Sequence, residues 1–303
     1  METVLAITSI MFFPAGISLI LGGMLYEWAD RKLVARFQNR IGPRWFQPLA
    51  DTIKLISKEE IQPLGVNRAL FFGLPVVALA GALTAALYVP IFGLQPAHSF
   101  PGDLIVTLYL LSLLTMCTGL AGWNSDSRFS IVGATRTLTQ LFAYEAPFLL
   151  ALLGPAMAAD SWQISKIVAY TETHWMIVLQ PVGFVIALIG LMGKLELPPF
   201  DAPEAETEIV AGALTEYSGR GLALFHIGKS VEMVVGVTLV TAFYLGGLGN
   251  PLIFLAKTLG LLLVMAFLQS VLVRLRIDQT VGMWWRAGAI LALLQILALI
   301  VLK

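Results

Sequence analysis

Long apolar segments recur along almost the whole chain, and they constrain its fold more than any other feature. A helix needs about 20 apolar residues to cross the hydrocarbon core of a bilayer. Eight segments approach or exceed that length: 3–27, 69–92, 103–122, 138–159, 175–194, 221–247, 252–273 and 286–302. The sequence therefore predicts an all-α, polytopic membrane protein with about eight transmembrane helices, organised as a single integral membrane domain over residues 1–303.

Composition excludes several other classes of protein. Charged residues make up only 13% of the chain, against about a quarter in soluble proteins, and the mean hydropathy is +0.83. The single cysteine, Cys117, excludes an internal disulfide, a cysteine zinc site and iron–sulfur ligation by this chain. His98, His174 and His226 lack metal-ligand spacing and are interpreted as packing or interfacial residues, so no metal site is predicted. A formal net charge of zero gives no argument for nucleic acid as a partner.

Basic residues are distributed unevenly between the two sides of the membrane. Counting through eight spans, one side receives the loops 30–63, 123–137, 194–220 and 274–285. With their flanks these loops hold fifteen of the nineteen Lys and Arg residues, whereas the opposite side holds Lys166, Lys257 and Lys303. By the positive-inside rule the four loops are cytoplasmic and both termini lie outside. The first span lacks a signal-peptide cleavage site and is expected to be retained.

The first of these loops is predicted to contain an amphipathic helix. Apolar side chains recur there at helical spacing, opposite charged ones: Phe46, Leu49, Ile53 and Ile56 against Asp51, Lys54 and Lys58. Such a helix lies at the membrane interface, where it either anchors the chain in lipid or forms a platform for a soluble subunit.

The third loop concentrates acidic residues. It carries six of the nineteen carboxyls: Glu196, Asp201, Glu204, Glu206, Glu208 and Glu216. Asp201 and Glu204 have the spacing of a capping box with an early proline, which predicts a helix beginning here, with Glu204 and Glu208 on one face and Glu206 pointing away. Crowding and desolvation would raise the pKa values of these carboxyls and let them pass protons; the alternative is a solvated acidic helix start.

Three charged residues fall inside predicted spans. Glu145 precedes Pro147, which frees a backbone carbonyl, so it is a candidate for ion transfer. At about two turns from the cytoplasmic end of its span, it could instead be a carboxylate facing the headgroups. Lys229 and Glu232, three residues apart, share a helix face and could neutralise each other, either as a structural pair or along an ion path.

Five segments together resemble one family: DRKLVARFQNRIGP, FQPLADTIKLISKE, GWNSDSRFSIVGATRTLTQLFAYE, PFDAPEAETEIVAGALTEYSG and RLRID. They resemble the eight-helix membrane subunit that attaches the peripheral arm in respiratory Complex I and in energy-converting [NiFe] hydrogenases, and the resemblance extends to the last helix. It implies a subunit of a prokaryotic plasma membrane complex, surrounded by lipid, that docks a peripheral iron–sulfur small subunit and a catalytic large subunit beside antiporter-like membrane subunits. It also implies that the cofactors, iron–sulfur clusters and in the hydrogenase branch a [NiFe] centre, belong to those partners.

The resemblance assigns residues to two predicted sets. Glu204, Glu206, Glu208, Glu216 and Tyr217 match the family's acidic loop motif, and Glu145 matches its membrane glutamate. With three further charged residues, the coupling set is Glu145, Asp201, Glu204, Glu206, Glu208, Glu216, Tyr217, Lys229 and Glu232. The partner-docking set is Arg31, Lys32, Arg36, Arg40, Arg44, Lys54, Arg128, Arg136, Arg274 and Arg276.

Two departures distinguish this chain from the quinone-reducing branch. That branch has ExxRxPFD before the acidic loop, where this chain has KLELPPFD, with Lys194 and Leu197 in place of the glutamate and the arginine. It also has Ala-Glu-Tyr where this chain has Gly228-Lys229-Ser230. The Gly-Lys-Leu context of Lys194 resembles the hydrogenase branch, which includes formate hydrogenlyase and archaeal membrane-bound hydrogenase or sulfane reductase.

The function predicted from these features is a membrane-anchor and ion-coupling subunit of a redox-driven proton or sodium pump. The alternative is a quinone-chamber subunit of an NADH or ferredoxin:quinone oxidoreductase. Lys229 is expected to pair with Glu232 or with a carboxylate of the acidic loop, because an unpaired ammonium is disfavoured at that depth.

Overall fold

The computed structural model describes residues 11–12 and 16–302, and the regular secondary structure within them is helical. The helices are α2 (Gly16–Phe37), α3 (Gln47–Ser57), α4 (Arg68–Ala85), α5 (Asp103–Trp123), α6 (Arg128–Ala158), α7 (Ile164–Thr173), α8 (Met176–Leu179), α9 (Pro181–Lys194), α10 (Glu206–Ile209), α11 (Gly219–Tyr244), α12 (Pro251–Val271), α13 (Ile277–Met283) and α14 (Ala289–Leu302). A π-helical turn at Trp284–Gly288 joins α13 to α14.

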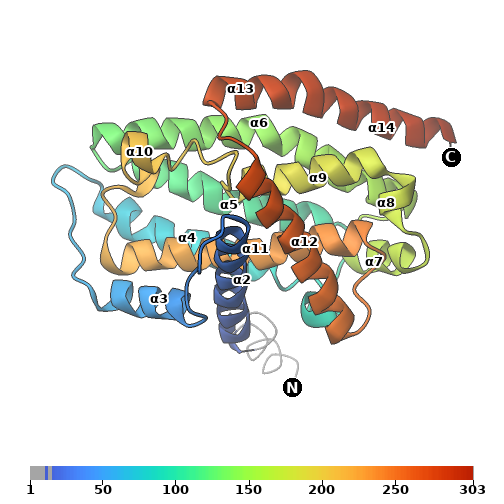
Figure 1. Cartoon of the computed structure of the whole chain (residues 1–303), viewed down its shortest axis with the longest axis horizontal. Coiled ribbons are helices and arrows are strands. Elements are labelled where there is room, and N and C mark those ends of the chain that lie inside the picture. The colour runs from blue at the N-terminus through green and yellow to red at the C-terminus, as the bar shows by residue number, and fades with distance from the viewer. Residues whose placement is uncertain (1–10, 13–15, 303) are drawn as a thin grey trace.

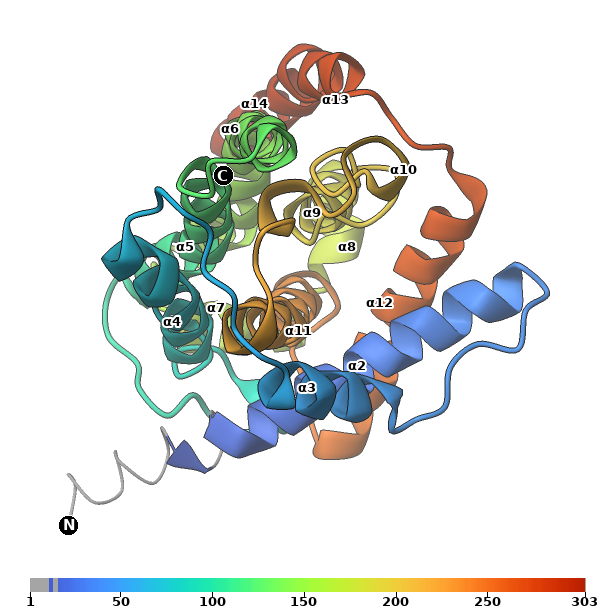
Figure 2. The same cartoon turned by 90° about the vertical axis from the view of Figure 1, so that its left-hand side faces the viewer.

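Helices α4, α5, α6, α9 and α11 run side by side, while α2 and α12 cross this bundle on one flank and α13–α14 follow α6 (Figures 1 and 2). Helix α11 is the most enclosed, with 83% of its apolar window buried. It is apolar on all sides, as expected for a helix surrounded by others, and it places a lysine and a glutamate in the middle of the protein.

Each of the eight predicted spans coincides with a helix, at least in part. Within the described residues, six helical segments are long and apolar enough to cross a membrane: α4, α5, α6, α11, α12 and the continuous α13–α14. Helix α9 is apolar but has only 14 residues, because Pro181 starts it late. The first predicted span, 3–27, lies partly outside the described residues, and α2 continues past its predicted end into charged sequence.

Helix α6 begins ten residues earlier than the apolar pattern indicates, at Arg128 instead of residue 138. Its first turns are polar, so a hydropathy criterion misses them. Glu145 therefore lies near the midpoint of α6, about five turns from the start of the helix and not two. This position removes the main reason to interpret Glu145 as a carboxylate facing the headgroups.

The predicted amphipathic helix is confirmed as α3, with Leu49, Ile53 and Ile56 exposed on its outer face. The helix predicted from Asp201 is wrong. Only the four residues of α10 are helical there, because Pro198, Pro199 and Pro203 interrupt the backbone N–H donors and the Asp201 carboxylate binds Arg274 instead of capping a helix.

Close backbone contacts hold the acidic loop against the bundle. A Cβ atom on Gly133 of α6 would lie 2.3 Å from the backbone of Gly212 and Ala213, so only glycine allows this approach. The buried side chain of Gln140 donates to the backbone oxygens of Gly193 at 2.9 Å and Phe200 at 2.8 Å. These contacts fix the end of α9 and the start of the acidic loop to one face of α6.

Candidate functional site

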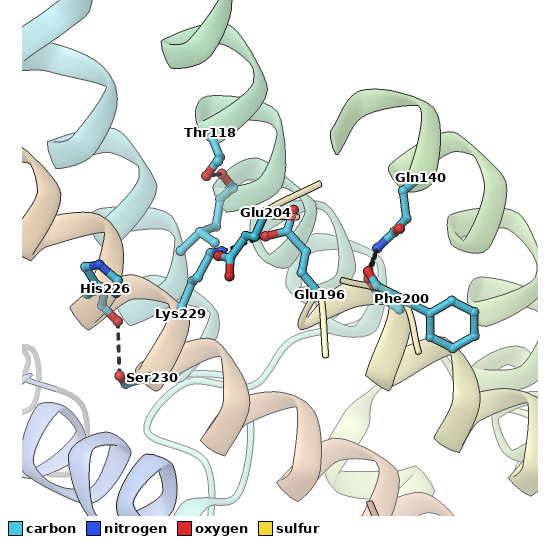
Figure 3. A network of polar contacts seen from close by, with 10 residues as sticks. Thr118, Gln140, Glu196, Phe200, Glu204, His226, Lys229 and Ser230 are labelled. Carbon is cyan, nitrogen blue, oxygen red and sulfur yellow. Dashed lines mark hydrogen bonds and ion pairs between the residues drawn. The ribbon is translucent and has the colours of Figure 1, made fainter. Parts of the chain in front are cut away.

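The centre of the site is the ammonium of Lys229 on α11, which contacts two carboxylates of the acidic loop (Figure 3). Lys229 Nζ lies 2.6 Å from Glu196 Oε2 and donates a second, short hydrogen bond to Glu204 Oε1. The expectation that Lys229 pairs with a carboxylate of the acidic loop is confirmed. The alternative pairing with Glu232 is wrong, because Glu232 is held by another lysine.

That second lysine is Lys194, at the end of α9. Its Nζ lies 3.2 Å from Glu232 Oε1, and the two side chains are only 3% and 1% exposed. Lys194 Nζ also lies 6.0 Å from the centre of the ring of Tyr144, the residue before Glu145 on α6. The two lysines that distinguish this chain from the quinone branch therefore lie in one polar network with Glu196, Glu204 and Glu232.

The two carboxylates that share Lys229 have different proton affinities. Burial raises the pKa of Glu196 above its ordinary value, although the Lys229 ammonium acts against this rise. The same ammonium dominates at Glu204 and lowers the pKa of that carboxyl. Glu204 is 47% exposed at its side chain, so it links the buried Glu196 to the outside.

A cavity of about 460 Å³ opens beside this network, between α2, α11 and the acidic loop. Most of its wall is polar or charged. The charged and ionisable residues that line it are Glu27, Asp30, Arg31, Glu196, Asp201, Glu204, Glu206, His226, Lys229 and Arg274. Six of these are carboxyls and three are permanent cations, so the cavity favours water and cations over an apolar molecule.

Two arginines hold the outer part of the acidic loop. Arg136 of α6 contacts Glu208 at 2.7 Å, and Arg274, after α12, contacts Asp201 at 3.2 Å and Glu208 at 3.5 Å. Glu208 therefore points to this surface cluster, while Glu204 points to Lys229, so the two do not act from one helix face as the spacing suggested. The arginines lower the pKa of Glu208, whereas burial raises the pKa of Asp201.

Glu145 occupies a separate position between α5 and α6. Its Oε1 accepts a short hydrogen bond from Ser112 Oγ. It lines an apolar cavity of about 180 Å³ together with residues such as Leu108, Tyr109 and Leu149. The membrane glutamate is thus partnered by a hydroxyl and not by a cation.

The other predicted residues lie around this core. Glu206 is exposed at the cavity mouth, Glu216 is half-buried, and Tyr217 is buried against the ring of Phe71. In the predicted docking set, Arg36, Arg40, Arg44, Lys54 and Arg128 are exposed, and Arg276 contacts Asp278 at the surface.

Four other members of the docking set are engaged within the chain. Lys32 donates to the Ile41 carbonyl at 2.7 Å, and Arg31 contacts Glu27 at 2.5 Å. Arg136 and Arg274 hold the acidic loop.

The sequence alone assigns no site role to Lys194, Glu196 or His226. Glu196 precedes the acidic loop motif, and Lys194 stands out only as a departure from another branch. The signal that could have found them is charge inside or directly beside an apolar span, because such a charge needs a partner nearby.

Comparisons with known proteins agree on one family. The sequence profile described as NADH dehydrogenase matches residues 8–300. An NADH-quinone oxidoreductase membrane subunit of Geobacter sulfurreducens is 38% identical over 292 residues, covering 89% of this chain and 88% of its own. Its counterpart in the NADH-quinone oxidoreductase of Carboxydothermus hydrogenoformans is 35% identical over 301 residues, covering 93% of this chain and 83% of its own.

A solved structure shares the fold. A chain in the structure of the membrane-bound sulfane sulfur reductase, an archaeal respiratory membrane complex, superposes with a TM-score of 0.85 at 24% identity. The match covers 97% of this chain and 98% of that one. The resemblance inferred from the sequence motifs is confirmed, and the chain belongs to the NADH dehydrogenase family of respiratory-complex membrane subunits.

Proposed function

We propose that this chain is the membrane-anchor and ion-coupling subunit of a Complex I-related redox complex. The observation that carries the proposal is the continuous set of alternating charges from the cavity into the bundle: Glu204, Lys229, Glu196, then Lys194 and Glu232. Charged groups beneath a membrane surface are costly unless they are paired and used. Such a set responds when a charge changes nearby, because each member's protonation depends on its neighbours.

The proposed mechanism begins in the cavity. An electron or proton transferred in a docked peripheral subunit changes the electrostatic potential at the half-exposed Glu204. Lys229 then shifts its interaction between Glu204 and Glu196, which raises or lowers the proton affinity of each. The change reaches Lys194 and Glu232 through Glu196, and Glu145 with Ser112 forms the next acidic position toward neighbouring membrane subunits. Either protons or sodium ions fit this scheme.

The exposed basic residues of the cytoplasmic loops form the surface on which we place the docked arm. In this proposal the partners are a peripheral iron–sulfur small subunit, a catalytic large subunit and antiporter-like membrane subunits, and the redox cofactors belong to those partners. The four loops gather at one end of the bundle, since α3, the turn between α5 and α6, and α10 lie toward the same end in Figure 1 and Arg274 reaches the acidic loop. The positive-inside rule places this end in the cytoplasm and both termini outside.

The experiment is ion transport by the purified complex in vesicles. We expect Glu204→Gln and Glu145→Gln to leave the complex assembled and able to transfer electrons, while ion uptake per electron falls. Glu59→Gln, at an exposed position beside the loop, is the matched control and should behave as the wild type. Failed assembly, with normal coupling in the complexes that do form, would show that these acids serve folding.

A second candidate function is quinone binding in the cavity, because the curated relatives are named as subunits of NADH-quinone oxidoreductases. The charged wall of the cavity and the two lysines of the network favour the first proposal, in which electrons end in the peripheral subunit, on protons or a sulfur compound. Turnover should then be indifferent to quinone analogues. Turnover that requires added quinone and stops with quinone-site inhibitors would establish the second function instead.

A further inference from the structure

The segment after α3 is fastened to the first turn of α11 at two points. Glu60 Oε1 accepts the Gly221 N–H at 3.2 Å, and Ser218 Oγ accepts the Ile61 N–H at 3.2 Å. The first N–H groups of a helix have no partner within the helix, and a carboxylate there also interacts favourably with the helix dipole. Glu60 therefore joins the cytoplasmic loop 30–63 to the helix that carries Lys229 and Glu232.

The two segments approach so closely that only glycine fits between them. Gly219 has a φ of +58°, and a Cβ atom there would lie 3.0 Å from the carbonyl oxygens of Lys58 and Glu59. Tyr217 stacks on Phe71 of α4 at a ring-centroid distance of 4.4 Å. The start of α11 is thus held by α4 and by the segment after α3.

A second connection runs from α3 to α11 through α2. Arg31 of α2 lies 3.7 Å from Asp51 of α3 and 2.5 Å from Glu27. Glu27 in turn accepts a hydrogen bond of 2.5 Å from Ser230 of α11, the residue after Lys229. Helix α3 therefore contacts α11 both before and beside the lysine.

Helix α3 faces outward with apolar side chains on its free surface. Leu49, Ile53 and Ile56 are 39%, 58% and 49% exposed. Anything that rests on this face, a subunit or the membrane interface, presses on a helix that is fastened to α11.

We propose that Glu60 is a positioning residue that ties the placement of α11 to whatever rests on α3, an inference that depends on the ion-coupling function proposed above. Lys229 lies about 12 Å beyond Gly221 along the helix axis. Its carboxylate partners, Glu196 and Glu204, are on another segment that Gln140 and Arg136 fix to α6. A movement of α11 relative to α6 therefore changes the distances within the network and, with them, proton affinities.

Amide hydrogen exchange and ion transport on the intact complex test this inference together. In Glu60→Ala the amides of residues 219–223 should exchange about fivefold faster, which corresponds to loss of one hydrogen bond. Ions moved per electron should fall about two- to thirtyfold with electron transfer retained, the usual range for residues along a coupling route. Glu60→Gln keeps an oxygen that accepts the Gly221 N–H and should restore most of both. Glu59→Ala, one residue earlier and exposed, is the control.

Three results would overturn the inference. Exchange at 219–223 that is unchanged in Glu60→Ala would show that Glu60 does not fix α11. Equal loss of coupling in Glu60→Gln and Glu60→Ala would show that its charge acts and not its hydrogen bond. Faster exchange with unchanged coupling would show that the position of α11 does not matter. A wild-type complex that moves no ions would refute the coupling function, whereas the exchange experiment would still decide whether Glu60 positions the helix.

Discussion

Two lysines in this protein occupy similar depths in the bundle but very different surroundings. Lys194 has one carboxylate partner, Glu232, and both side chains are sealed from solvent. Lys229 has two partners, Glu196 and Glu204, and lies on a cavity wall. A sealed pair has no alternative arrangement when one member is lost, whereas an ammonium shared between two carboxylates can change its preference. Lys194 is thus a charge that holds the bundle together, and Lys229 is a charge that can report events outside it.

The largest effect is expected from breaking the sealed pair. Glu232→Gln leaves the Lys194 ammonium buried without its counter-ion, which should destabilise the protein by about 3–5 kcal/mol. Thermal unfolding of the purified complex would measure this loss. Replacing both residues with apolar ones, Lys194→Met with Glu232→Leu, should recover stability to within about 1 kcal/mol of the wild type. A single variant as stable as the wild type would show that the pair is not sealed.

A smaller effect on stability, but a larger one on transport, is expected at the open centre. In Glu204→Gln, Lys229 keeps Glu196 as its partner, so the unfolding temperature should change little. Loss of the shared carboxylate should reduce ion movement roughly tenfold, the change in protonated fraction that one pKa unit produces. Parallel measurement of unfolding and transport in Glu204→Gln and Glu232→Gln would test the contrast. Similar profiles in the two variants would remove the distinction between the lysines.

The open centre should also titrate in a defined order. Because the pKa of Glu196 is raised and that of Glu204 is lowered, acidification should protonate Glu196 first. Glu204 stabilises the fold fully above its ordinary pKa of 4.5, and this contribution is lost as the pH falls through its lowered value. The sign is opposite for Glu196, whose protonated form the fold favours, so its contribution declines as the pH rises through the raised value.

Infrared difference spectra can follow this titration through the carboxyl C=O bands. Glu196→Gln should remove the band that appears first on acidification, and Glu204→Gln the later one. The reverse order would mean that Lys229 belongs mainly to Glu196.

The smallest effect is expected at the surface cluster that holds the acidic loop. Arg136→Gln removes the contact with Glu208, an exposed pair that salt screens strongly. A slight fall in the unfolding temperature at low ionic strength should disappear at high salt. Persistence of the effect at high salt would indicate that Arg136 acts through its hydrogen bond to the Ala202 carbonyl.

The sequence predicts much of this architecture because hydropathy and charge are local properties. Eight apolar segments, the amphipathic α3 and the gathering of charged loops all follow from residues near one another in the chain. The pairing of charges does not follow, because it depends on contacts between segments. Lys229 and Glu232 share a helix, yet each pairs with a residue at the end of α9 or in the loop beyond it, and neighbours on the helix do not pair. The capping box at Asp201 failed for the same reason, since Arg274, far along the chain, takes the carboxylate.

The shortness of α9 has a consequence for the membrane voltage. Fourteen residues of helix span about 21 Å, well under the roughly 30 Å of a hydrocarbon core. Lys194 ends this helix, so the cytoplasmic aqueous phase approaches the sealed pair more closely than it approaches residues of the longer helices. The electrical potential then falls across a thinner insulating layer at this point, and an ion that leaves Glu232 crosses most of the field in a short step. A full crossing is worth about 2.3 kcal/mol per charge at 100 mV, so the step beyond Glu232 should carry most of the complex's sensitivity to voltage.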